Sequence, residues 1–121
     1  MKKSTFLSAC LALLFVFSFH INAFAADASR VDLRPREDVK STRVVEVLPG
    51  EKLGVYVKNT DNVDGNDMSF YVEGTNIEGD LTYGNQTYNH RFNVRPGKYR
   101  LFLVCDDHSN CQGYGILSSR R

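Results

Sequence analysis

Apolar and polar residues alternate with a period of two over most of the chain beyond residue 42, which is the pattern of strands with one buried face. In the clearest such segment, residues 52–58, Leu53, Val55 and Val57 share one face. The same alternation predicts strands at 43–48, 68–73, 81–83, 87–95, 98–105 and 111–117. Residues 98–105 are the most apolar of these segments, which predicts a central strand covered on both sides.

Turn-forming residues separate the predicted strands. Pro49-Gly50 and Pro96-Gly97 each follow an alternating segment, where Pro fixes φ and Gly permits a turn. No segment of the sequence has a convincing helical period. The pattern predicts an all-β fold, a small antiparallel β-sandwich of about seven strands, with a small closed β-barrel as the alternative.

Residues 1–25 have the organisation of a secretory signal peptide. Lys2 and Lys3 form a basic start, an apolar run extends from Phe6 to Phe19, and Ala23-Phe24-Ala25 supplies the small residues that a signal peptidase requires. A signal that begins with lysines indicates a bacterial protein. The predicted localisation is therefore secreted, either periplasmic or extracellular.

Two other interpretations of this segment fit less well. A transmembrane helix needs about 20 apolar residues, and this run is shorter, so we expect no membrane span. Leu7-Ser8-Ala9-Cys10 has the letters of a lipoprotein signal, but most of the apolar run follows Cys10 instead of preceding it.

Cleavage after Ala25 leaves 96 residues, which is enough for one domain. Residues 26–42 are polar and irregular, so we expect an N-terminal polar arm there and a single β-sandwich domain over residues 43–121. Without Lys2 and Lys3, the chain has 13 basic and 14 acidic residues. This near-neutral balance argues against nucleic acid as a partner, because nucleic-acid binding needs a concentrated basic face.

Cys105 and Cys111 are the cysteines of the mature chain, and an exported protein meets an oxidising compartment. We therefore predict a disulfide that closes a short loop. Asp106, Asp107 and His108 lie within this loop and are candidate binding residues, because a rigid loop loses little entropy on binding. Zinc held by reduced cysteines and His108 is the alternative, but the spacing matches no usual zinc motif.

Residues 61–67 are rich in side chains that carry oxygen. Asp61, Asp64 and Asp67 are candidate ligands for calcium, a hard cation that prefers several oxygen ligands. The spacing differs from that of an EF-hand, and the closing Glu is missing. The alternative is a solvated turn, and we expect no other cofactor.

Tyr56, Tyr71 and Tyr114 fall on the outward faces of their predicted strands. Exposed tyrosine rings can stack on sugars while the hydroxyl adds a polar contact, so a coplanar row of the three would suit a glycan. The alternative is structural, because tyrosine is also an ordinary strand residue.

His90 lies on the apolar face of its predicted strand and is a candidate general base. The sequence has no Gly-x-Ser-x-Gly motif or other recognisable nucleophile site, so we expect no enzyme.

The predicted function is that of a small secreted bacterial binding module at the cell envelope or outside the cell. Its first partner to test is a glycan or cell-wall polymer. The alternative is a protein-binding module, such as an inhibitor, a toxin-neutralising factor or an assembly subunit, which uses the Cys105–Cys111 loop.

Overall fold

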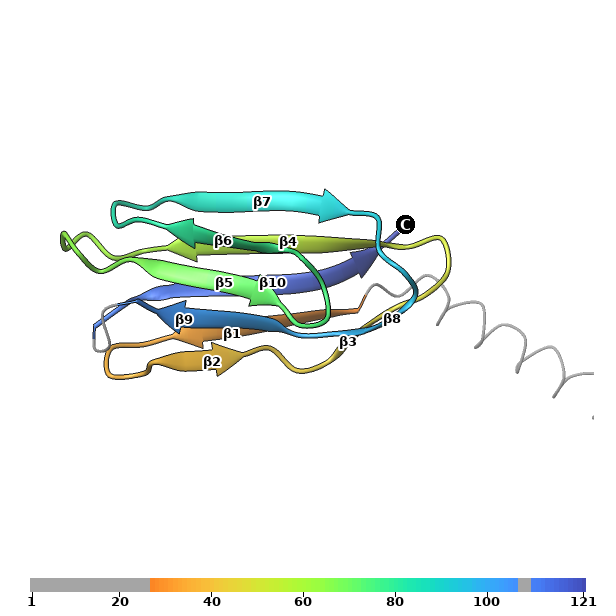
Figure 1. Ribbon diagram of the computed structural model, residues 1–121, viewed down its shortest axis with the longest axis horizontal. Coiled ribbons are helices and arrows are strands. Elements are labelled where there is room, and N and C mark those ends of the chain that lie inside the picture. Colours follow the sequence, from red (N-terminus) through yellow and green to blue (C-terminus); the bar gives the residue numbers. More distant parts are fainter. Residues whose placement is uncertain (1–26, 107–109) are drawn as a thin grey trace, which may run out of the picture.

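The structure is a computed structural model that describes residues 27–106 and 110–121. Over these residues the chain forms ten strands and no helix (Figure 1). Their bounds are β1 Ala28–Leu33, β2 Val39–Ser41, β3 Val45–Val47, β4 Lys52–Asn59, β5 Met68–Val72, β6 Glu78–Leu81, β7 Thr87–Phe92, β8 Gly97–Tyr99, β9 Leu101–Cys105 and β10 Gly113–Arg120.

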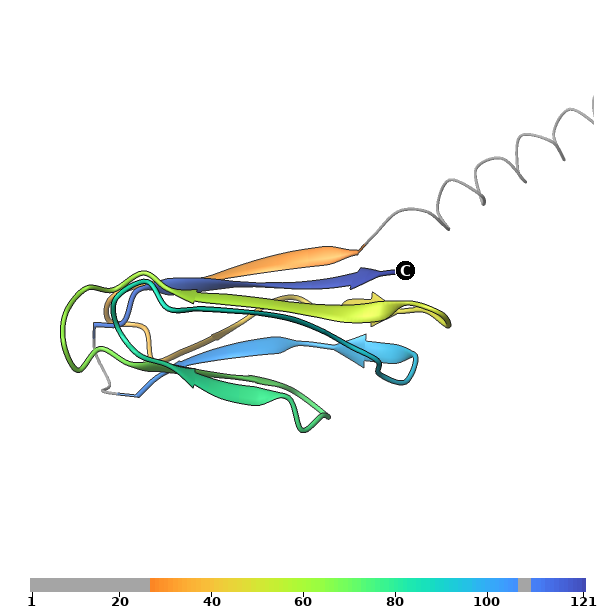
Figure 2. The same ribbon diagram turned by 90° about the horizontal axis from the view of Figure 1, so that it is seen from above.

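The strands form two facing sheets, which Figure 2 shows as separate layers. Sheet A has the strand order β1-β10-β4-β7, and sheet B has the order β2-β9-β5-β6. Strands β3 and β8 form a third, two-stranded sheet. All strand pairs are antiparallel, so the predicted antiparallel β-sandwich is confirmed.

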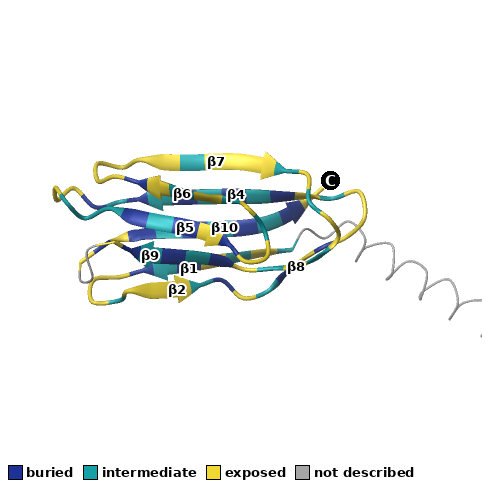
Figure 3. Ribbon diagram, viewed as in Figure 1, coloured by how far each residue is buried: buried dark blue, intermediate teal, exposed yellow. Residues whose placement is uncertain are grey.

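The core lies between sheets A and B, where apolar residues of both inner faces meet (Figure 3). In β4 the alternation of apolar and polar residues places Leu53, Val55 and Val57 inside, as the sequence predicts. Phe70 of β5 is the largest side chain among the fully buried ones. Burying each such side chain contributes roughly 1.5–3 kcal/mol before the entropy of folding is subtracted, so this layer stabilises both sheets.

Strand β9 is central in sheet B, as predicted, but the expected cover on its second face is wrong. Phe102 and Val104 point to the outer face and remain half-buried, because no further layer lies over sheet B among the described residues. The Tyr71 ring instead stacks on Phe102, with 4.9 Å between the ring centroids.

The expected polar arm at residues 26–42 is also wrong, because this segment contains β1 and β2. All six residues of β1 pair with β10, and Val31 and Leu33 are 4% and 2% exposed in the core. Their polar neighbours Arg30 and Asp32 face outward and pair with each other, so the segment looks polar in the sequence although it alternates.

Two of the predicted strands differ most from the structure. The predicted strand 98–105 is divided into β8 and β9, and the predicted strand 81–83 shares only Leu81 with β6, which begins at Glu78. Gly79 of β6 lies over the ring of Phe70, where an added Cβ would come within 2.8 Å of ring carbons. A glycine at this position therefore allows β6 to lie against the core.

Candidate functional site

The outer face of sheet A is strongly basic. In β1, β4, β7 and β10 the outward positions carry five basic side chains and one acidic side chain, Asp32; the basic ones are Arg30, Lys52, Lys58, Arg91 and Arg120. Arg30 is paired with Asp32 at 2.9 Å, and the other four basic side chains form no ion pair with another described residue. This face therefore carries a concentration of positive charge that the near-neutral total does not reveal, so the expectation that no nucleic acid binds loses its support from net charge.

A shallow, open hollow of about 360 Å³ lies on this face. Its lining includes a tyrosine, two arginines and two smaller polar side chains, namely Tyr56, Arg91, Arg120, Asn89 and Ser118. Among the described residues, no carboxylate lines it. The hollow therefore combines an aromatic wall with hydrogen-bond donors and positive charge.

Gly54 forms the floor of the hollow because it has no side chain at an outward position of β4. Its Cα pairs with Arg91 on one side and with Ser118 on the other. A Cβ at Gly54 would lie 2.7 Å from the Ser118 Oγ, so any larger residue would fill this space.

Tyr56 belongs to a row of side chains that continues away from the hollow. Its ring lies 5.8 Å from that of Tyr114, between centroids, with the planes tilted by 31°. The Arg30 guanidinium covers the Tyr114 ring at 4.2 Å from its centroid. Two nitrogens of the same guanidinium donate hydrogen bonds to the Asp32 carboxylate. Asp32 therefore fixes Arg30, Arg30 fixes the Tyr114 ring, and Tyr114 packs against Tyr56 on the side away from the hollow.

The charges in this row stay fixed near neutral pH. Hydrogen bonding to Asp32 raises the pKa of Arg30, and hydrogen bonding to Arg30 lowers the pKa of Asp32. The neighbouring Tyr56 hydroxyl raises the pKa of Tyr114, which keeps that ring neutral. Arg30 therefore remains a cation on an uncharged ring over the physiological pH range.

The structure brings Tyr56 and Tyr114 together but leaves Tyr71 on sheet B, at the opposite outer face. The three tyrosines therefore do not form one coplanar row. The period-two pattern shows which face of a strand is outward, but it does not show to which sheet the strand belongs.

The predicted disulfide between Cys105 and Cys111 is present, with a Cα–Cα distance of 5.6 Å. It suggests an oxidising, extracytoplasmic location. Asp106 is exposed beside it, and its carboxylate lies 2.6 Å from the Ser69 Oγ. Asp107 and His108 lie outside the described residues, as does the predicted signal peptide.

The residues considered for calcium form a loop held by its own hydrogen bonds. Asp61 is buried, and its carboxylate accepts from the Val63 N–H at 2.9 Å and from the Asn66 amide at 3.0 Å. Asn59, at the end of β4, is fully buried and donates to the carbonyls of Asn66 and Leu81. This network gives the polar side chains a structural role.

Asp61, Asp64 and Asp67 do not converge on a metal site. Among the described residues, no three His, Cys, Asp or Glu side chains lie close enough together to hold a metal ion. Asp67 instead accepts a hydrogen bond from the Tyr83 N–H at 3.3 Å.

His90 is exposed at the edge of sheet A, and its ring lies edge-on to Phe92, 4.6 Å between centroids. It forms no ion pair with a carboxylate in the described part of the chain. The arrangement is that of an aromatic side chain at a sheet margin.

Five residues of the hollow were not among the predicted site residues, namely Gly54, Asn89, Arg91, Ser118 and Arg120. One signal was present in the sequence: Gly54 interrupts the outward side of an otherwise regular strand. A glycine inside a strand often marks a place where a ligand or another chain approaches closely.

No family model matches this chain, and no curated protein resembles it significantly. Solved structures share the β-sandwich fold at low similarity. PirA is 11% identical, with a TM-score of 0.45 over 77% of this chain and 93% of its own. A subunit of the disulfide-linked pili of Bacillus endospore appendages is 9% identical, with a TM-score of 0.46 over 79% of this chain and 86% of its own.

A third similar structure is the C-terminal CBM6 of LamC, a marine laminarinase from Zobellia galactanivorans. It is 14% identical, with a TM-score of 0.40 over 76% of this chain and 99% of its own. These similarities concern the fold alone. In residues 27–106 and 110–121, no helix is long and apolar enough to cross a membrane.

Proposed function

We propose that this protein is a secreted bacterial binding module without catalytic activity, and that it binds a glycan on the outer face of sheet A. The observation that carries the proposal is the hollow over Gly54, which has Tyr56 as one wall and hydrogen-bond donors on the others. Sugars present apolar C–H faces and a rim of hydroxyls, so an aromatic ring beside polar side chains matches their chemistry.

The position of the hollow favours an extended polymer. It is open to solvent and lies on β4 and β10, each eight residues long and each hydrogen-bonded to a strand on both sides. Sites on central strands are held rigidly, and rigid sites lose little entropy on binding. A glycan chain would lie across this face without being enclosed by it.

The test is a binding screen with mature exported protein. Affinity electrophoresis against a set of soluble polysaccharides, followed by titration calorimetry on those that retard the protein, would measure the interaction. Tyr56→Ala should weaken binding at least five-fold. Tyr71→Ala is the matched control, because it removes a half-exposed tyrosine from the opposite face. Failure to bind any glycan, or equal losses in the two variants, would contradict the proposal.

A protein partner is the second candidate function, and the outer face of sheet B favours it. Tyr71 and Val39 there are 39% and 52% exposed, and Asp106 extends the same face toward the Cys105–Cys111 loop. Mixed apolar and acidic surfaces of this kind suit protein partners. A pull-down from the envelope fraction, in which Tyr71→Ala loses a partner that Tyr56→Ala retains, would favour this function over the first.

A further inference from the structure

We infer that the glycan is acidic, and that Arg91 and Arg120 bind one of its carboxylate, sulfate or phosphate groups above Gly54. This inference rests on the proposed glycan-binding function and names the class of glycan. The inference rests on the observation that two guanidinium groups line the hollow, whereas no carboxylate of residues 27–106 or 110–121 does.

The register of the strands allows both arginines to reach one group. Arg91 pairs with Gly54, Gly54 pairs with Ser118, and Arg120 follows Ser118 on the same face of β10. The strands that carry Arg91 and Arg120 are therefore separated by β4 alone, a distance of about 10 Å between strand axes. Two extended arginine side chains can span this distance from both sides. Because the β4 residue beside Arg91 is a glycine, the space above it is bordered by the small Ser118 side chain, whose Oγ lies 2.7 Å from where a Cβ would be.

Neither arginine is neutralised within the described part of the chain. The three ion pairs there involve Arg30, Lys40 and Arg43, and none involves Arg91 or Arg120. Guanidinium groups bind carboxylate and phosphate through two parallel hydrogen bonds, which gives them both strength and orientation. Arg120 also pairs in register with Lys52, which adds a third cation on the same face, outside the lining of the hollow.

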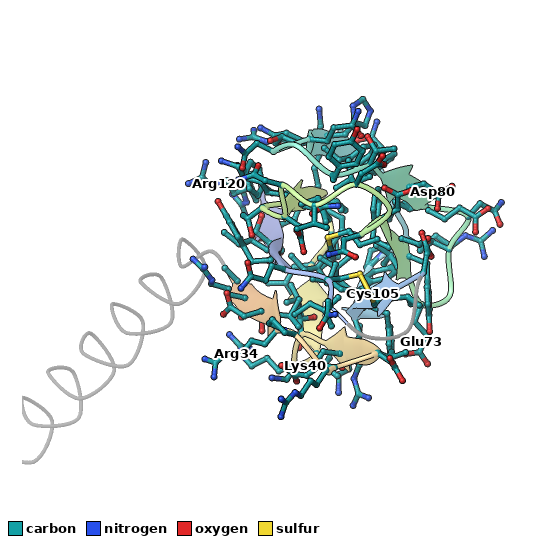
Figure 4. The ribbon with its side chains drawn as sticks, turned by 90° about the vertical axis from the view of Figure 1, so that its left-hand side faces the viewer. Arg34, Lys40, Glu73, Asp80, Cys105 and Arg120 are labelled. Carbon is teal, nitrogen blue, oxygen red and sulfur yellow. A yellow bond between two sulfur atoms is a disulfide. The ribbon has the colours of Figure 1, made fainter. Side chains whose placement is uncertain are left out.

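The opposite face would repel the same ligand. On sheet B the outward strand positions include Glu78 and Asp80 and no basic residue. In Figure 4, Arg120 and Arg34 lie on one side of the sandwich and Asp80 and Glu73 on the other, and Lys40 of β2 lies at the lower edge. An acidic polymer would therefore be attracted more strongly to the outer face of sheet A than to that of sheet B.

The test compares polymers with the same backbone and different charge. Polygalacturonate carries a carboxylate on each sugar, and its fully methyl-esterified form carries none. We expect the mature protein to bind polygalacturonate at least ten-fold more tightly than the ester, and to lose that preference as salt is raised. Dextran sulfate and unmodified dextran form a second pair, which shows whether a sulfate also binds.

The variants Arg91→Gln and Arg120→Gln should each weaken binding of the acidic polymer about five-fold or more, and should weaken binding of the neutral one clearly less, because glutamine still donates a hydrogen bond but carries no charge. Arg34→Gln is the matched control. It removes the same charge from an exposed position beyond Leu33, which pairs with Gly113 at the other end of β10. Thermal unfolding of each variant would confirm that the fold is intact.

The outcomes separate this inference from the proposed function. Equal binding of the acidic and neutral forms would overturn the inference and leave glycan binding in place. Equal losses in Arg34→Gln and Arg91→Gln would also overturn it, because attraction by overall charge would then suffice. Binding to neither pair, nor to any other glycan, would overturn the proposed function itself.

Discussion

At the scale of single residues, Gly54 faces the surface of sheet A, whereas Gly79 faces the buried core. A Cβ at Gly54 would meet the Ser118 Oγ, the end of a small side chain on the surface of sheet A. A Cβ at Gly79 would meet the ring of Phe70, which is 2% exposed and cannot move without disturbing the core. The first glycine therefore shapes a surface, and the second allows a strand to pack.

Substitutions at these glycines should separate binding from stability. Gly54→Ala should retain the fold, because Ser118 can rotate away and alanine suits a strand better than glycine by roughly 0.5–1 kcal/mol. Glycan binding should fall several-fold as the hollow fills. Gly79→Ala should destabilise the protein by about 1–3 kcal/mol through overpacking and leave binding of the folded protein unchanged. Urea unfolding and titration calorimetry on both variants check this. A destabilised Gly54→Ala that still binds, or a stable Gly79→Ala that does not bind, would contradict it.

Residues also show how far a sequence can be interpreted. The inward positions of β4 were predicted correctly, because alternation fixes a face. The grouping of Tyr71 with Tyr56 failed, since alternation carries no information about sheet order. Arg91 and Ser118 meet Gly54 only through the pairing of β7 and β10 with β4, so their common site was hidden from sequence reasoning.

At the scale of elements, the start of β1 is held by contacts to two other strands. Asp27 accepts a hydrogen bond at 2.8 Å from Arg43 and another at 3.1 Å from the Glu46 N–H of β3. Its backbone carbonyl accepts from Ser119 of β10 at 2.8 Å. These contacts explain why the segment is a strand although its composition predicts an arm.

The same contacts predict an effect of acid. Partial burial opposes ionisation of Asp27, but the Glu46 N–H and Arg43 outweigh it, so the pKa of Asp27 is lowered from its ordinary value of 3.8. A lowered pKa in the folded state means that the carboxylate stabilises the fold above about pH 4 and ceases to do so as the pH falls through the folded-state pKa. Urea midpoints measured from pH 6 to pH 2.5 should fall less steeply for Asp27→Asn than for the parent. Parallel profiles would contradict this.

The Cys105–Cys111 disulfide should restrain the loop between β9 and β10 without being required for folding. The two cysteines are six positions apart, and closing so short a loop contributes about 2 kcal/mol. The core of both sheets lies elsewhere, in residues such as Leu53, Phe70 and Leu103. A double variant, Cys105→Ala with Cys111→Ala, should therefore unfold cooperatively at a lower urea concentration. Loss of any cooperative transition would show that the disulfide holds the fold.

At the scale of the whole molecule, export and oxidation should occur together. The pattern of residues 1–25 predicts a signal peptide cleaved after Ala25, and β1 begins at Ala28, so cleavage would leave the paired strands intact. Intact mass and thiol titration of naturally exported protein should give a chain that starts at Ala26 and has no reactive thiol. A lipid attached to Cys10, or two reactive thiols, would contradict the prediction.

The pairing of β1 with β10 also determines how the molecule responds to force. The two strands are antiparallel, so β1 begins and β10 ends at the same end of the sandwich (Figure 1). Pulling Asp27 and Arg121 apart would load the hydrogen bonds between these strands one after another, because those bonds lie across the strands. The strands should then peel apart at low force. Pulling between Arg121 and Arg34, which follows β1 at the opposite end of the sandwich, would instead load the bonds between β1 and β10 all at once, so single-molecule stretching should require a clearly higher force in that geometry.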